Sequence, residues 1–247
     1  MVLRILNKSE LEQIVDDDAQ RVINHFIDKA VELQPELRIG QEERPIQIPK
    51  EHIEQWFVQA LGVDPVGAGS YPVDVIRYGE FAADIKMLSC KVDRAGRIIN
   101  TLSGEASLGQ KFEDGDVTLD ELFAKKRKDE IVEKWKKILV EKYATVYKEK
   151  NINIIYYFFL LRAGMKFYVC GCSLNEEELV NISSSRMTND SVFIDGYIDS
   201  VYGDVKIYKA KKRMELRLRP EAWVKNGKTM EFTTTKKIGR KNLRGTF

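Results

Sequence analysis

The segment that most constrains the fold is the stretch FAADIKML at residues 81–88. It holds two charged side chains, Asp84 and Lys86, among apolar neighbours, and alternate residues of a strand point to opposite faces of a sheet. Apolar residues on both faces are typical of a strand inside a sheet rather than at its edge. The sequence therefore predicts a central strand over 81–92, with Asp84 and Lys86 on one face and Ile85 on the other.

The elements expected around this strand give the fold class. A strand over 73–78, joined to it by a turn at Gly79-Glu80, would form a hairpin. The other elements expected are a helix over 50–61 that stops at Gly62, a helix over 119–147, and strands over 152–162 and 165–173. This order predicts an α/β (α+β) fold, a mixed central β-sheet flanked by helices.

The two ends of the chain are expected to extend this arrangement within a single domain over 1–247. Ser9 and Glu12 have the spacing of a capping box, which would open an N-terminal amphipathic helix. Strand-like pieces fill 192–232. We divide the domain into a helical part over 1–49, a core over 50–173 and a β-rich C-terminal extension over 174–247.

Basic residues are concentrated at the C-terminal end. Residues 205–247 hold 14 Lys/Arg and 3 Asp/Glu, a net of +11, so the remainder carries −9 because the whole chain is +2. A basic end on an acidic body suggests a polyanionic partner, although a solvated lysine-rich surface is an equal alternative. The candidate DNA-binding residues are Lys209, Lys211, Lys212, Arg213, Arg217, Arg219, Lys236, Lys237, Arg240, Lys241 and Arg244.

The cysteines and the apolar runs bear on the environment of the chain. There are three cysteines, Cys90, Cys170 and Cys172. Their odd number, with no signal-peptide pattern, predicts a reducing compartment, the cytoplasm. Cys170 and Cys172 alternate on an expected strand, and we interpret them as buried structural thiols. No apolar run reaches the roughly 18 residues of a membrane span, so no membrane partner is predicted.

The residues that indicate chemistry lie on the expected hairpin. A short hairpin would bring Asp74 opposite Asp84, beside Lys86. Two adjacent carboxylates repel each other, and Mg²⁺, which prefers oxygen ligands, would relieve that repulsion. A bound metal makes water more acidic, and a lysine stabilises charge on phosphoryl oxygens. The alternative is an ordinary surface ion pair, worth about 0–1 kcal/mol.

At these residues the chain resembles the PD-(D/E)xK nuclease superfamily. Pro72-Val73-Asp74 resembles the first half of its motif with one extra residue, and Asp84-Ile85-Lys86 matches the second half. The resemblance covers roughly residues 50–173. It implies a restriction-endonuclease-like core ordered helix, strand, strand, strand, helix, strand. The first of those strands would lie near 67–71 or merge with 73–78.

The resemblance also implies roles for these residues. Asp74 and Asp84, helped by the Ile85 carbonyl, would ligate Mg²⁺, and Lys86 would position the attacking water. Glu54, with Glu51 as the second choice, would be the further acidic catalytic residue.

The implied function is a magnesium-dependent endonuclease acting on double-stranded DNA, similar to type II restriction endonucleases, which are often homodimers. Two alternatives stay open. One is a repair or structure-specific nuclease of the same superfamily. The other is a non-catalytic nucleic-acid-binding protein. An RNA substrate also stays open.

Overall fold

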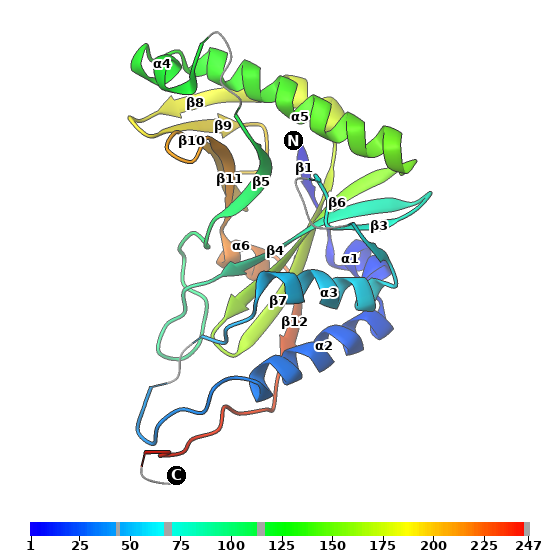
Figure 1. Cartoon of the computed structure of the whole chain (residues 1–247), viewed down its shortest axis with the longest axis vertical. Helices are drawn as coiled ribbons and strands as arrows, with labels where there is room; N and C mark the ends of the chain where they lie inside the picture. Colours follow the sequence, from blue (N-terminus) through cyan, green and yellow to red (C-terminus); the bar gives the residue numbers. More distant parts are fainter. Residues whose placement is uncertain (43–44, 67–70, 113–116, 245–247) are drawn as a thin grey trace.

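The computed structural model describes residues 1–42, 45–66, 71–112 and 117–244, which form two β-sheets with helices around them (Figure 1). The seven-stranded sheet has the order β1 (Leu3–Ile5), β7 (Lys166–Leu174), β6 (Ile154–Ala163), β4 (Phe81–Ser89), β3 (Val75–Arg77), β2 (Asp64–Pro65), and β12 (Met230–Thr233) also pairs with β7. The five-stranded sheet has the order β5 (Ala106–Lys111), β11 (Arg213–Leu218), β10 (Gly203–Tyr208), β9 (Ser191–Asp195), β8 (Ser183–Met187).

The helices lie on both sides of the seven-stranded sheet. They are α1 (Lys8–Ile14), α2 (Asp17–Glu32), α3 (Lys50–Leu61), α4 (Leu119–Ala124), α5 (Lys128–Lys150) and α6 (Pro220–Lys225), with a 3-10 turn, η1, at Glu176–Asn181. Strands β4 and β6 are parallel, whereas β3 and β7 run antiparallel to their neighbours. The predicted mixed sheet flanked by helices is therefore confirmed.

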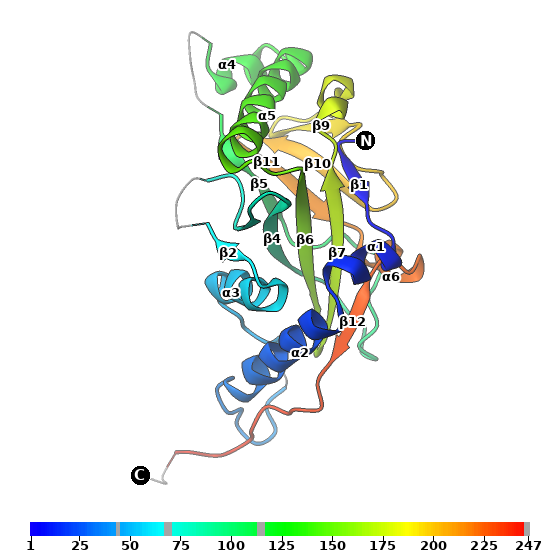
Figure 2. The same ribbon diagram turned by 90° about the vertical axis from the view of Figure 1, so that its right-hand side faces the viewer.

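Strand β4 lies inside the sheet, as the sequence predicts. It pairs with β3 on one side and β6 on the other. Ala82 and Leu88 join a core cluster that includes residues of α5 and of the five-stranded sheet. Ala83 and Ile85 join a second cluster with residues of α2 and α3, on the opposite face. Figure 2 shows α2 and α3 together on that side.

The helix ends are only partly as predicted. Helix α3 spans Lys50–Leu61 and stops at Gly62, which has the left-handed φ of 59° that favours glycine. The predicted capping box of Ser9 and Glu12 is wrong. Asn7 caps α1 instead, since its side chain accepts the Glu10 N–H at 2.9 Å and Glu10 accepts the Asn7 N–H at 2.8 Å.

The predicted long helix over 119–147 is two helices. Helix α4 ends at Ala124 with Lys125 as its C-cap, and Lys126 has a φ of 54°, which breaks the helical path before α5 begins at Lys128. The expected first strand of the core also differs, because β2 lies at Asp64–Pro65. The alternative position at 67–71 falls mostly outside the described residues.

The three predicted parts of the chain share their sheets. Strand β1 from 1–49 and strand β12 from 174–247 both pair with β7 of the predicted core. Strand β5, also from the predicted core, pairs with β11 in the other sheet. The boundaries at 49 and 173 therefore mark no separate folding units.

Two smaller sequence expectations concern cysteines and membranes. Cys170 and Cys172 are buried free thiols, as predicted. No helix in the described ranges has the length and apolar character that a membrane crossing requires.

Candidate active site

The β3–β4 hairpin brings the two aspartates together. Val75 pairs with Ala83, so the next position in the register sets Asp74 opposite Asp84. The Asp74 N–H donates to the Ala83 carbonyl at 2.9 Å, and Asp74 Oδ2 accepts the Ile85 N–H at 2.7 Å. The hairpin register therefore places Asp74 opposite Asp84, as the sequence predicts.

Three oxygens converge on the ammonium group of Lys86. Lys86 Nζ forms an ion pair with Asp84 Oδ1 and lies 3.4 Å from Asp74 Oδ2. It also lies 3.4 Å from the carbonyl oxygen of Ile85. The side chains of Lys86 and Asp74 are 15% and 16% exposed, against 5% for Asp84. Solvent therefore reaches the site from the side of Asp74 and Lys86, and Asp84 is its most buried residue.

Burial strongly affects the pKa values of Asp84 and Lys86. Burial raises the pKa of Asp84 to about 6, although the neighbouring Lys86 ammonium opposes the rise. For Lys86, burial favours the neutral amine, but the charges of Asp84 and Asp74 outweigh it and raise the pKa above its ordinary value. At neutral pH the site therefore holds an ionised Asp84 beside a protonated Lys86.

A second buried lysine, which the sequence analysis did not single out, lies beneath the site. Lys142 on α5 is only 4% exposed, and its Nζ donates to the Leu108 carbonyl at 2.6 Å and to the Tyr157 hydroxyl at 3.5 Å. Tyr157 is the register partner of Asp84 on β6. Burial lowers the pKa of Lys142 to about 8, and the charge of Asp84 limits the drop.

Two further tyrosines complete this buried group. The Tyr143 hydroxyl lies 2.8 Å from the hydroxyl of Tyr157 and 2.8 Å from that of Tyr197. All three tyrosines are at most 1% exposed. A hydrogen-bonded network of this kind satisfies its polar atoms and fixes the strand that carries Tyr157 next to Asp84.

Comparison with known proteins supplies no relative. No protein-family model, no curated protein and no solved structure matches the chain. The chemistry of the site therefore has to be inferred from its own atoms.

The donor set fits a hard cation held by few protein ligands. Among the described residues, no group of three or more His, Cys, Asp or Glu side chains could hold a metal ion. The oxygens around Lys86 Nζ come from two carboxylates and one carbonyl. Mg²⁺ is commonly bound by one or two carboxylates, with waters and substrate phosphates completing its shell. The set therefore suits Mg²⁺ and lacks the sulfur and nitrogen ligands of structural zinc sites.

The predicted acidic residue of α3 has no such support. Helix α3 packs Ile53 and Phe57 against the sheet face that carries Ile85, opposite the face of Asp84 and Lys86. Glu54 belongs to no metal-holding group of the described residues, and neither does Glu51. A catalytic role for Glu54 or Glu51 stays a prediction from the resemblance alone.

The predicted DNA-binding residues do not form one surface. One group lies on or beside β10, β11 and α6, in the five-stranded part, and the other lies in the C-terminal tail at the far end of the molecule (Figure 1). Several are paired within the chain: Lys209 with Asp120, Arg219 with Asp204, and Lys236 with Glu32. Lys237, Lys241 and Arg244 of the tail are exposed.

Proposed function

We propose that the chain is a magnesium-dependent nuclease that hydrolyses phosphodiester bonds in double-stranded DNA. The observation that carries the proposal is the convergence of Asp74, Asp84 and the Ile85 carbonyl on one cationic position. Two nearby carboxylates with a lysine are what phosphodiester hydrolysis needs, because the substrate is a negatively charged electrophile and charge neutralisation is most of the task.

Each residue has a distinct part in this proposal. Asp74, Asp84 and the Ile85 carbonyl would hold Mg²⁺, which supplies positive charge at the scissile phosphate and makes nearby water more acidic. The Ile85 N–H keeps the Asp74 carboxylate oriented. Lys86, whose Nζ contacts these same oxygens, would turn away from them when Mg²⁺ binds, and it would then hold the attacking water and stabilise negative charge on a phosphoryl oxygen. The water oxygen would form a new P–O bond while one ester P–O bond breaks, and the proton that the water loses would be replaced, through solvent, by protonation of the departing alkoxide oxygen.

The element order supports placing the chain with the PD-(D/E)xK nucleases. Helix α3, strands β2, β3 and β4, helix α5 and strand β6 follow in the expected order, with β5 and α4 inserted between β4 and α5, and the strands β2, β3, β4 and β6 are neighbours in one sheet. Sequence-specific cutting, similar to a type II restriction endonuclease, is the narrower form of the proposal. We assign the reading of DNA to the five-stranded sheet, because some of the predicted DNA-binding residues lie on or beside its strands β10 and β11.

The second candidate is a nucleic-acid-binding protein without activity. The direct ion pair of Lys86 with Asp84 favours it, since such a pair can serve stability alone. Incubation with long duplex DNA, with and without Mg²⁺, separates the candidates. Discrete magnesium-dependent fragments support the narrower proposal, a smear supports a non-specific or structure-specific nuclease, and retardation without cleavage supports the second candidate. A parallel digest of duplex RNA tests the substrate class.

Cleavage should need more magnesium at low pH. Protons compete with a metal for carboxylate oxygens, and the raised pKa of Asp84, about 6, brings that competition close to neutrality. We expect the half-saturating Mg²⁺ concentration to rise steeply below about pH 6 and to be nearly constant from about pH 7 to 8. Cleavage rates over a magnesium series at each pH measure this. A half-saturating concentration that is flat from about pH 5 to 7 would show that Asp84 does not ligate the metal.

A further inference from the structure

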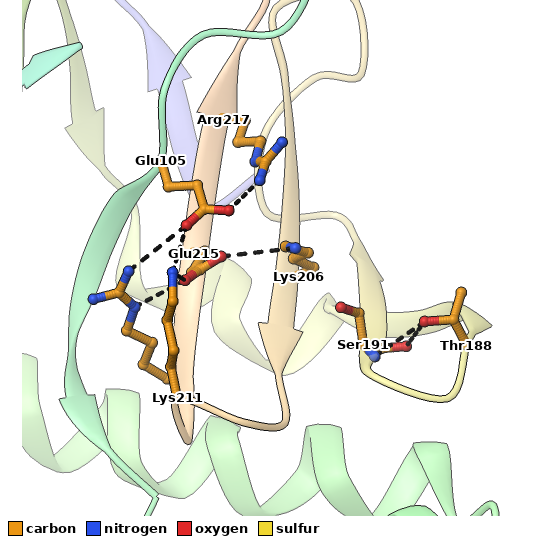
Figure 3. A network of polar contacts seen from close by, with 8 residues as sticks. Glu105, Thr188, Ser191, Lys206, Lys211, Glu215 and Arg217 are labelled. Carbon is orange, nitrogen blue, oxygen red and sulfur yellow. Dashed lines mark hydrogen bonds and ion pairs between the residues drawn. The ribbon is translucent and has the colours of Figure 1, made fainter. Parts of the chain in front are cut away.

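The outer face of the five-stranded sheet carries an array of opposite charges. Ile207, Met214 and Leu216 point to the buried face, in the same core cluster as residues of α5. Residues that alternate with them, Lys206 on β10 and Arg213, Glu215 and Arg217 on β11, point to the other face. Glu105, next to the start of β5, reaches the same face (Figure 3).

Four cations share two carboxylates on this face. Glu105 pairs with Lys211 at 2.7 Å, with Arg213 at 3.7 Å, and with Arg217. Glu215 pairs with Arg213 at 2.8 Å, with Lys211 at 3.2 Å and with Lys206 at 3.7 Å. The hydrogen bond from Lys211, together with that from Arg217, lowers the pKa of Glu105 to about 2. We call Lys206, Lys211, Arg213 and Arg217 the sheet cation cluster. Its four positive charges face two carboxylates, which leaves an excess of two positive charges.

Three of the four cations are more exposed than both carboxylates, and the exception is Lys206, whose side chain is 18% exposed. The side chains of Lys211, Arg217 and Arg213 are 43%, 35% and 33% exposed, whereas Glu105 is 23% exposed and Glu215 is fully buried. An approaching molecule therefore meets positive charge first. Arg213 and Arg217 are four residues apart on one strand, but their guanidinium groups both contact Glu105, as does the Lys211 ammonium. A phosphate that took the place of the Glu105 carboxylate would therefore meet three cations at once.

We propose that this face docks the phosphate backbone of duplex DNA and that Glu105 competes with the phosphates for the sheet cation cluster. The inference deepens the proposed function, on which it rests, by naming a contact surface for the substrate. Glu215 is fully buried under the cations, and its ion pairs hold Lys206, Lys211 and Arg213 in place. Glu105 is accessible, and phosphates would displace its pairs with Lys211 and Arg217. Loss of the Glu105 charge would then free these two cations for DNA.

The matched control is Glu231 on β12. Glu231 pairs with Lys166 at 2.7 Å, the same distance as Glu105 to Lys211, and it lies in the other sheet. Glu231→Gln and Glu105→Gln remove the same charge from the whole protein. A difference between them therefore reports the location of the charge.

The test measures binding of the full chain to a fluorescent duplex of mixed sequence, in EDTA so that no cleavage occurs. We expect Glu105→Gln to bind more tightly than Glu231→Gln. Its plot of log affinity against log salt should be steeper by about 0.9 for each additional phosphate that the protein neutralises. Over a fourfold salt range that slope corresponds to about a 3.5-fold change in affinity for each such phosphate. Lys211→Gln should weaken binding.

Equal affinity and slope for the two glutamine variants would overturn the inference. If Glu105→Gln does not fold, Lys206→Gln and Lys211→Gln test the inference instead. Unchanged DNA binding by both of these variants would also overturn it. An equal increase in affinity for polyglutamate would assign the face to acidic polypeptides and overturn it as well. If Glu105→Gln binds DNA more tightly but the wild-type protein shows no magnesium-dependent cleavage, the DNA-binding surface is supported and the nuclease proposal is rejected. If the wild-type protein cleaves DNA but the two glutamine variants bind it equally, the nuclease proposal is supported and the DNA-binding surface is rejected.

Discussion

Replacement of Lys86 by alanine should remove most of the DNA cleavage activity while leaving duplex binding largely intact. Lys86 Nζ contacts both aspartates and the Ile85 carbonyl, so the substitution removes the cation that lies directly against them. Groups that hold a nucleophile or stabilise developing charge contribute about 10²–10⁴-fold to a rate, and we expect a loss of that size. Time courses of plasmid cleavage with saturating Mg²⁺ measure it.

The control for this variant is Lys91→Ala. Lys91 follows β4 closely in the sequence, is exposed, and carries the same charge. Binding to a labelled duplex in EDTA should be similar for both variants, because a single lysine in a recess adds little to the affinity that many phosphate contacts supply. Cleavage by Lys86→Ala at the rate of Lys91→Ala would remove Lys86 from the mechanism. Equal loss of binding and cleavage would assign it to substrate binding.

The part of the site that could be predicted depends on local patterns. The alternation in residues 81–88 set Asp84 and Lys86 on one face, and the short hairpin fixed Asp74 opposite them. Helix α3 was predicted to the residue because Gly62 marks its end. In each case the deciding residues are neighbours in the sequence, so periodicity and turn chemistry are enough.

The part that could not be predicted depends on distant partners. Strand β5 has no clear pattern of its own and forms by pairing with β11, and Glu105 beside it binds Arg217, 112 residues away. The capping box at Asn7 and the break at Lys126 show how small local differences shift a helix end. Lys142 was the available signal that was missed. It falls at helical spacing among the buried residues Trp135, Leu139 and Val146, where a lysine is out of place.

That lysine gives the second large effect, which is on stability. The pKa of Lys142 is about 8 in the folded chain, against an ordinary value of 10.5. Below about pH 8 the amine is protonated in both the folded and unfolded chain, so folding buries a charge at a cost. Above about pH 10.5 it is neutral in both, and the cost is gone. The free energy of unfolding of the wild type should therefore rise, relative to Lys142→Met, as pH increases from about 8 to 10.5, by on the order of 3 kcal/mol in total.

Urea unfolding of both proteins at about pH 7, 9 and 10 measures this difference. Methionine keeps the length and apolar character of the lysine chain, so packing on α5 is largely preserved. Lys148→Met, at an exposed position of the same helix, is the control, and its difference from the wild type should stay constant across the range. A constant difference for Lys142→Met as well would mean that the amine beneath Asp84 stays charged throughout. Its burial would then be offset by the carboxylates above it, and Lys142 would belong to the charge balance of the site and not only to its scaffold.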